Sequence, residues 1–243
     1  MFPLYDERRE RAARREVVRQ ANALPSSIVR IGVDFGRMHD FTAIAITEEI
    51  KTPGERLPVF QIHALERVPL GTPYPDIVDR VGVVMAGARQ KSAERKAEGG
   101  RGYVVHLLVD ATGVGAAVVD SLRAAGIGPL ISVTLTGSDH VVEHARDRVS
   151  MGKAYLVGKL QVLLQEQRLR YPKTAESKIL ADELRDYRIA ISDSGHASFN
   201  ARSGKHDDII IATGLSVGTG RSHAKPGKTF SAHTRTVKAP WGG

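Results

Sequence analysis

The stretch IVRIGVDFGRMHDFTAIAIT, residues 28–47, contains two apolar runs joined by a turn with a glycine. The first run ends at Asp34, and the second begins at Phe41 and is rich in β-branched residues. This pattern predicts two antiparallel strands with a carboxylate at the bend. The segment VFQIHALERV, residues 59–68, follows a Pro-Gly turn and predicts a third strand of the same meander.

The next part of the chain predicts a parallel continuation of the sheet. A helix is expected to start near Pro75, and the almost continuously apolar run YVVHLLVD, residues 103–110, is typical of a central strand covered on both faces. A turn with two glycines, a helix and the strand PLISVTL, residues 129–135, then complete a βαβ unit. The expected fold is α/β, with three antiparallel strands, then parallel strands, and flanking helices.

Two further helices are expected over residues 152–167 and 174–187, then a short hairpin within 188–202 and a buried helix in GKHDDIIIATGLSVG, residues 204–218. The polar stretch TGSDHVVEHARDRV, residues 136–149, has no clear period and is expected to form a surface loop. We therefore divide the chain into a basic amphipathic N-terminal helix (1–25), one α/β domain (26–218) and a basic flexible tail (219–243).

Composition limits the classes of function. The formal net charge of +8 favours polyanionic partners, of which nucleic acid is the most common. The chain has no cysteine, which excludes disulfides, thiolate metal sites and cysteine nucleophiles. No apolar run is long enough to span a bilayer, so we expect a cytoplasmic protein with no membrane partner.

Four aspartates lie at the ends of expected elements. Asp34 and Asp110 each end a strand, and Asp207 and Asp208 open the last helix. Each could be an ordinary turn or cap residue, but together they could coordinate Mg²⁺ or Mn²⁺, which prefer hard oxygen ligands. Two such ions could activate water and stabilise the leaving oxygen of a phosphodiester. We therefore predict a catalytic site with two ions, in which Asp34, Asp110 and at least one of Asp207 and Asp208 are metal ligands. The other of these two would add charge, a hydrogen bond or a second contact.

Four further residues are candidates for an auxiliary or substrate-binding role beside these aspartates. His206 could orient a water molecule or contact phosphate, although a single histidine is more often structural. Arg37, Gly113 and Gly115 could contact substrate, the glycines by allowing phosphate to approach a helix N-terminus. The GKT of residues 227–229 is rejected as a nucleotide site, because the upstream glycine of a P-loop is replaced by Ser222.

Five segments, in order, resemble the C-terminal nuclease domain of tailed-phage large terminase subunits, within the ribonuclease H-like fold. They are GVDFGRMHDFTAIAI, LLVDATGVGAAVVDSL, LVGKLQVLLQEQRLRYP, LADELRDYR and GKHDDIIIATGLSVG. The resemblance implies an endonuclease that cuts concatemeric viral DNA during genome packaging with Mg²⁺ or Mn²⁺. It also implies partners such as the portal, the small terminase subunit or a separate ATPase motor, in the cytoplasm of a host cell.

Three alternatives use the same residues differently. A resolvase-like nuclease would share the metal site but act on branched DNA as a dimer. An actin-like ATPase or sugar kinase would use the two glycine turns for phosphate, but needs two such domains. A non-catalytic DNA-binding protein would explain the charge and leave the aspartates unexplained.

Overall fold

The computed structural model describes residues 24, 26–36, 40–113, 115–186, 188–191, 197–200, 206–218 and 230–231. The predicted basic helix of residues 1–25 and Arg37 therefore lie outside the described residues, apart from Leu24. The predicted tail is described at two residues, Phe230 and Ser231.

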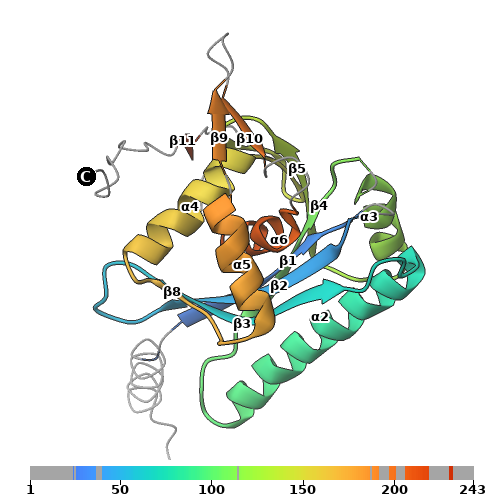
Figure 1. Cartoon of the computed structure of the whole chain (residues 1–243). Coiled ribbons are helices and arrows are strands. Elements are labelled where there is room, and N and C mark those ends of the chain that lie inside the picture. Colours follow the sequence, from blue (N-terminus) through green and yellow to red (C-terminus); the bar gives the residue numbers. More distant parts are fainter. Residues whose placement is uncertain are drawn as a thin grey trace, which may run out of the picture.

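The described part of the chain contains a large mixed sheet, five helices and a small hairpin (Figure 1). The strands of the large sheet are β1 (Ser26–Asp34), β2 (Thr42–Lys51), β3 (Val59–Val68), β4 (Val104–Asp110), β5 (Leu130–Thr136), β6 (His140–Ala145), β7 (Arg148–Gly152), β8 (Leu169–Arg170) and β11 (Phe230–Ser231). The hairpin is formed by β9 (Arg188–Ile191) and β10 (Ala197–Asn200), and the helices are α2 (Tyr74–Ala97), α3 (Gly115–Ala124), α4 (Lys153–Gln165), α5 (Ala175–Asp186) and α6 (Asp208–Gly218).

The strand order is β11-β6-β7-β5-β4-β1-β2-β3-β8. Strands β1, β2 and β3 form the expected antiparallel meander, and β4, β5 and β7 continue from β1 in parallel. The predicted mixed α/β sheet is thus confirmed. Because β1, β4, β5 and β7 run in the same direction, their carboxyl ends lie side by side. They form the carboxyl edge of the sheet, which is distinct from its outermost strands, β11 and β8.

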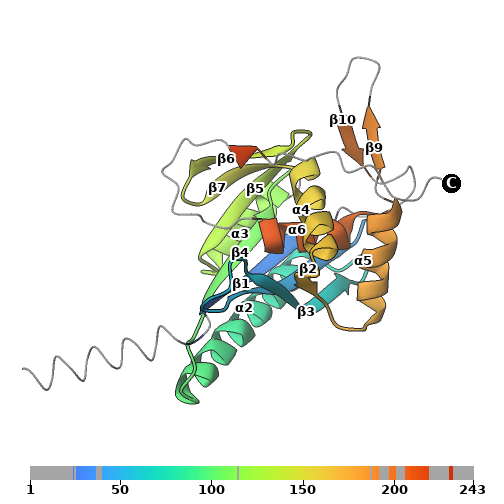
Figure 2. The same ribbon diagram turned by 90° about the vertical axis from the view of Figure 1, so that its left-hand side faces the viewer.

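Each face of the sheet is covered by its own set of helices (Figures 1 and 2). Helices α2 and α3 cover one face, where their apolar residues pack on Val29, Ile31 and Val33 of β1. Helix α6 lies across the other face between α4 and α5, and its isoleucines join a second core with β2, β3 and β5. The two-sided burial explains why β4 is almost continuously apolar.

Helix α6 lies unusually close to β1 and β2 because the residues beneath it are small. A Cβ added at Gly32 would overlap the carbonyl oxygen of Ala212, and Ala43 and Ala45 of β2 are fully buried on the same side. The hydroxyls of Thr47 and Ser216 are 2.7 Å apart in this contact. The opening stretch therefore determines both the first hairpin and the position of the last helix.

The prediction of a surface loop over residues 136–149 is wrong. Most of this segment forms β6 and β7, which pair antiparallel, and β7 adds to β5 in parallel. Val149 and Met151 of β7 are buried, whereas β6 lies near the sheet edge with only partial burial. An exposed strand near an edge tolerates polar and charged residues, which conceals its two-residue period.

Two short strands lie in segments for which the sequence predicts no strand. Leu169–Arg170 forms β8 beside β3, and Phe230–Ser231, within the predicted tail, forms β11 beside β6. The five helices expected from residue 75 onward are all present, and the Thr174 hydroxyl caps the start of α5 by accepting a hydrogen bond from the Ser177 amide. Within the described ranges, no helix is both long and apolar enough to cross a membrane.

Candidate metal centre

Asp34 and Asp110 end two adjacent parallel strands. The register pairs Val33 of β1 with Val109 of β4, so the two aspartates follow at neighbouring positions on the same edge. Side chains alternate along a strand, which puts Asp34 on the same face as Gly32 and Asp110 on the same face as Leu108. Both are on the face that α6 covers.

The chain that leaves Asp110 is held in a tight turn. The Asp110 carboxylate accepts a hydrogen bond of 2.8 Å from the Thr112 amide. Gly113 has a φ of 63°, and a Cβ on Gly115 would overlap the Asp110 carbonyl oxygen. Both glycines are therefore needed for the backbone of this turn, and their predicted contact with substrate stays a prediction.

Helix α6 brings the other two carboxylates to this edge. Asp208 is the first residue of the helix and is buried, while Asp207 precedes it and is partly exposed. Burial raises the pKa of Asp34 well above its usual value, and the nearby charges of Asp110, Asp207 and Asp208 raise it further. The four predicted ligands therefore lie near enough to one another for the other three charges to affect the pKa of Asp34.

Two other carboxyls of the cluster show the same effect. Burial raises the pKa of Asp110, although hydrogen bonds from Thr112 act against it. Burial also raises the pKa of Asp208, and Arg67 partly offsets this. Unfavourable burial of several like charges is relieved when a cation binds between them.

The donor chemistry fits a hard divalent cation, because the cluster offers carboxylate oxygens from Asp34, Asp110, Asp207 and Asp208. In this structure, the described residues contain no group of three or more His, Asp or Glu side chains that are positioned to hold a metal ion. A bound cation would therefore have to draw these carboxylates closer together.

Lys153 lies within this cluster, and the sequence analysis missed it. Its Nζ is 3.2 Å from Asp207 Oδ2. Its positive charge also lowers the pKa of Asp34 and of Asp110, opposing the effect of burial. In the sequence it is one lysine in a basic chain, and nothing in the local pattern distinguishes it.

Arg67 and Glu183 support Asp208 from the other side. Arg67 Nη2, on β3, lies 2.5 Å from Glu183 Oε1 and 2.8 Å from Asp208 Oδ2. Glu183 Oε2 accepts a hydrogen bond of 2.7 Å from the Ile210 amide in the first turn of α6. Burial, together with the nearby Asp208 charge, raises the pKa of Glu183 to about 7, even though the Ile210 amide and Arg67 act in the opposite direction. The sequence pattern does not distinguish Glu183, because its neighbours in space are distant in the chain.

His206 lies beside Asp208 but makes only long contacts with carboxylates. Its Nδ1 is 3.9 Å from Asp208 Oδ1 and 4.0 Å from Asp40 Oδ1, and its ring packs edge-on against Phe41. Arg67 lies over the same Phe41 ring, 4.8 Å from its centroid. His206 is thus close enough to the cluster to remain an auxiliary candidate.

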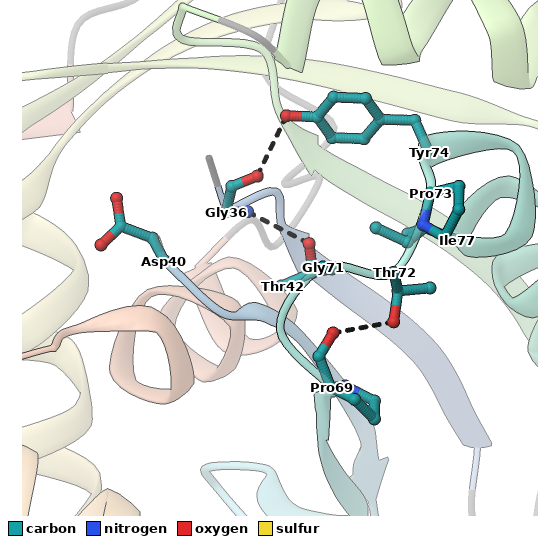
Figure 3. Close-up of a pocket in the computed structure, with 9 residues that line it drawn as sticks. All are labelled: Gly36, Asp40, Thr42, Pro69, Gly71, Thr72, Pro73, Tyr74 and Ile77. Atoms are coloured by element: carbon teal, nitrogen blue, oxygen red, sulfur yellow. Dashed lines mark hydrogen bonds between the residues drawn. The ribbon is translucent and has the colours of Figure 1, made fainter. Parts of the chain in front are cut away.

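The turn after Asp34 is held by hydrogen bonds beside a cavity of about 350 Å³ (Figure 3). Thr42 Oγ1 accepts a hydrogen bond of 3.1 Å from the Gly36 amide, and the Tyr74 hydroxyl donates one of 3.1 Å to the Gly36 carbonyl. Tyr74 opens α2, so this helix is tied to the turn. Asp40, which also lines the cavity, is largely exposed.

The mixed sheet, with its antiparallel meander, its parallel continuation and its flanking helices, has a ribonuclease H-like α/β fold. No established family profile matches the chain. It is 28% identical over 193 residues to the large terminase subunits of Thermus phage G20c and of Thermus virus P23-45, in each case covering 79% of this chain. The match covers 31% of each relative, so the chain spans about a third of the length of the curated relatives it matches.

Solved structures agree on the fold. The large terminase nuclease of the thermophilic phage G20c superposes with a TM-score of 0.50 at 24% identity, covering 78% of this chain and 81% of that one. The nuclease domain of the Thermus phage P74-26 large terminase gives a TM-score of 0.50 at 22% identity and covers 78% of each chain. The resemblance seen in the motifs is confirmed: the chain is similar to phage large terminase subunits in sequence and to their nuclease domains in fold.

Proposed function

We propose that this chain is a metal-dependent endonuclease that hydrolyses phosphodiester bonds of double-stranded DNA, and that it cuts concatemeric viral DNA during genome packaging. The observation that carries the proposal is the gathering of Asp34, Asp110, Asp207 and Asp208 at one edge of the sheet. The similarity to large terminase subunits in sequence and to a large terminase nuclease in fold supports the same function. The net charge of +8 suits a DNA substrate.

The four carboxylates come from three elements. Asp34 would hold the ions, Mg²⁺ or Mn²⁺, from the end of β1. Asp110 would hold them from the end of β4, and Asp207 and Asp208 from the start of α6. Bound ions would supply a nucleophilic water of lowered pKa and stabilise the leaving oxygen.

The protein holds these ligands in place from several directions. Hydrogen bonding to Thr112 fixes the Asp110 carboxylate, and the Arg67 and Glu183 pair fixes the first turn of α6. These contacts limit how far the carboxylates can move when a cation draws them together. The portal, the small terminase subunit and an ATPase motor are the partners that this function would involve.

Plasmid cleavage tests the proposal. We expect the wild-type chain to convert supercoiled plasmid to nicked or linear DNA in Mg²⁺ or Mn²⁺ and to be inactive in EDTA. Asp34→Asn and Asp110→Asn should each lower the rate by at least about 100-fold while DNA binding and the circular dichroism spectrum are retained.

A matched control is Asp120→Asn on α3, because the Asp120 side chain is 80% exposed and its contact is with Arg123. This variant should cleave like the wild type. DNA binding by the wild type without any metal-dependent cleavage would instead favour a non-catalytic DNA-binding protein.

A further inference from the structure

Lys153 reaches the acidic edge because of the sheet topology. It follows Gly152, the last residue of β7, and β7 runs parallel to β5 with Gly152 opposite Thr136. The carboxyl end of β7 therefore lies on the same edge as Asp34 and Asp110. A Cβ on Gly152 would overlap the carbonyl oxygen of Ser138, so the close approach at this position requires glycine.

The position of Lys153 is unfavourable for its own helix. It is the first residue of α4, whose N-cap Gly152 makes no side-chain capping hydrogen bond. A positive charge in the first turn opposes the helix dipole, which favours acidic residues there. The stability of α4 therefore does not explain this lysine, and the neighbouring carboxylates do.

The Lys153 ammonium is the counter-charge for one side of the cluster. It lies 3.2 Å from Asp207 Oδ2, and both side chains are about one-quarter exposed (28% and 26%). Asp208, by contrast, is paired with Arg67, which it shares with Glu183. The two adjacent aspartates thus have separate cationic partners, one on α4 and one on β3.

We propose that Lys153 is a positioning residue that competes with divalent cations for Asp207 and thereby sets the metal concentration at which the site fills. The inference rests on the proposed function, since it takes Asp207 as a metal ligand. An ammonium at hydrogen-bonding distance occupies one carboxylate oxygen and adds a positive charge that repels an approaching cation. Metal entry and the Lys153–Asp207 pair therefore oppose each other.

Titration calorimetry of the full chain with Mn²⁺, without DNA, tests the competition directly. Lys153→Met should bind Mn²⁺ about tenfold more tightly than the wild type, a change of about 1.4 kcal/mol, because the competing charge is removed. Lys153→Arg keeps the charge and should stay within about threefold of the wild type. Lys91→Met, at an exposed position of α2, is the matched control and should bind as the wild type does.

Thermal unfolding gives a second measurement and reports whether each variant is folded. Without metal, Lys153→Met should melt below the wild type, because the carboxylates lose their counter-charge. With saturating Mn²⁺ its melting temperature should rise by more than that of the wild type, as expected for tighter ligand binding to the folded state. If Lys153→Met does not fold, Lys153→Gln, which keeps a polar group, is measured in the same way.

The possible results separate the two proposals. Equal or weaker Mn²⁺ binding by Lys153→Met, with a wild type that binds Mn²⁺ and cleaves plasmid, would overturn the role of Lys153 and leave the nuclease function intact. A wild type that binds Mn²⁺ but does not cleave DNA would overturn the nuclease function and leave the competition to be decided by the calorimetry. A wild type that binds no Mn²⁺ would overturn both.

Discussion

The Glu183 side chain connects two helices and one strand at the acidic edge. It lies on α5, accepts a hydrogen bond from the Ile210 amide of α6 and pairs with Arg67 of β3. It is 8% exposed, so its carboxylate depends on these partners for compensation of its lost hydration. One residue therefore links the position of α6 to the sheet.

Replacing Glu183 should destabilise the fold strongly. Glu183→Ala leaves the Ile210 amide and part of Arg67 without a partner, and we expect a loss of about 2–4 kcal/mol in the free energy of unfolding, measured in urea. The neighbouring Asp182→Ala is the control, because Asp182 makes an exposed pair with Arg185. That change should cost less than about 0.5 kcal/mol. Similar losses for both variants would contradict the assigned role of Glu183.

At the scale of elements, the contact between α6 and β1 determines where Asp207 and Asp208 lie. Gly32 allows the helix backbone to approach the strand, and Thr47 and Ser216 fix the contact by their hydroxyls. The opposite end of α6 is held as well, because Tyr155 and Lys159 of α4 both donate hydrogen bonds to the Gly218 carbonyl. The helix is thus held along its length and at both ends.

Gly32→Ala tests this contact. The added methyl group overlaps the α6 backbone, so the helix must move, and we expect a loss of about 1–3 kcal/mol in stability together with weaker plasmid cleavage. Gly87→Ala in α2 is the matched control, since a Cβ there meets nothing within 4 Å. It should raise stability by about 0.5–1 kcal/mol and leave cleavage unchanged. Full stability and activity in Gly32→Ala would show that α6 is not confined by this contact.

At the scale of the whole molecule, a second charged cluster lies at the opposite end of the first hairpin. Glu48 of β2 is 2% exposed and pairs with His63 of β3 and Arg95 of α2, while Ser27 of β1 contacts Arg95. Burial alone would raise the pKa of Glu48, but hydrogen bonds from His63, Arg95 and Ser27 together lower it to about 2. The cluster ties α2 to three strands.

This cluster predicts how stability depends on pH. The pKa of Glu48 is lower in the folded chain than the usual 4.5, so its stabilisation is complete above about pH 4.5 and is lost as the pH falls toward 2. The loss should be on the order of 3 kcal/mol, measured by urea unfolding at several pH values. Glu48→Gln should be less stable at pH 7 and should lose less stability over this range. Glu55→Gln, in an exposed turn, should leave the pH dependence unchanged.

Most of the fold could be predicted from local patterns. The two apolar runs around Asp34, the continuous run before Asp110 and the helical period of α4 and α5 each depend on residues close together in the chain. The segment of β6 and β7 could not, because its pairing with β5 depends on a distant strand. Likewise, β8 consists of two residues whose extended form is decided by β3.

Some residues of the candidate site could likewise be predicted from the sequence, and others could not. Asp34, Asp110, Asp207 and Asp208 could be selected because each ends a predicted strand or opens a predicted helix, which is a signal within one segment. Lys153, Arg67 and Glu183 carry no such signal, since their importance arises from neighbours more than 50 positions away in at least one contact each. The role of such side chains can be recognised only in the folded structure, where packing of the strands and helices brings them together.

Local spacing, apolar patterning and composition are enough to predict most of the strands and helices, the positions of the four aspartates and the positive charge. Which cation faces which carboxylate, and how closely α6 approaches the sheet, can be seen only in the folded chain. Coulomb interactions and close packing depend on distances in space, and these are set when β7 pairs with β5, α4 packs on α6, and α6 packs on β1 and β2.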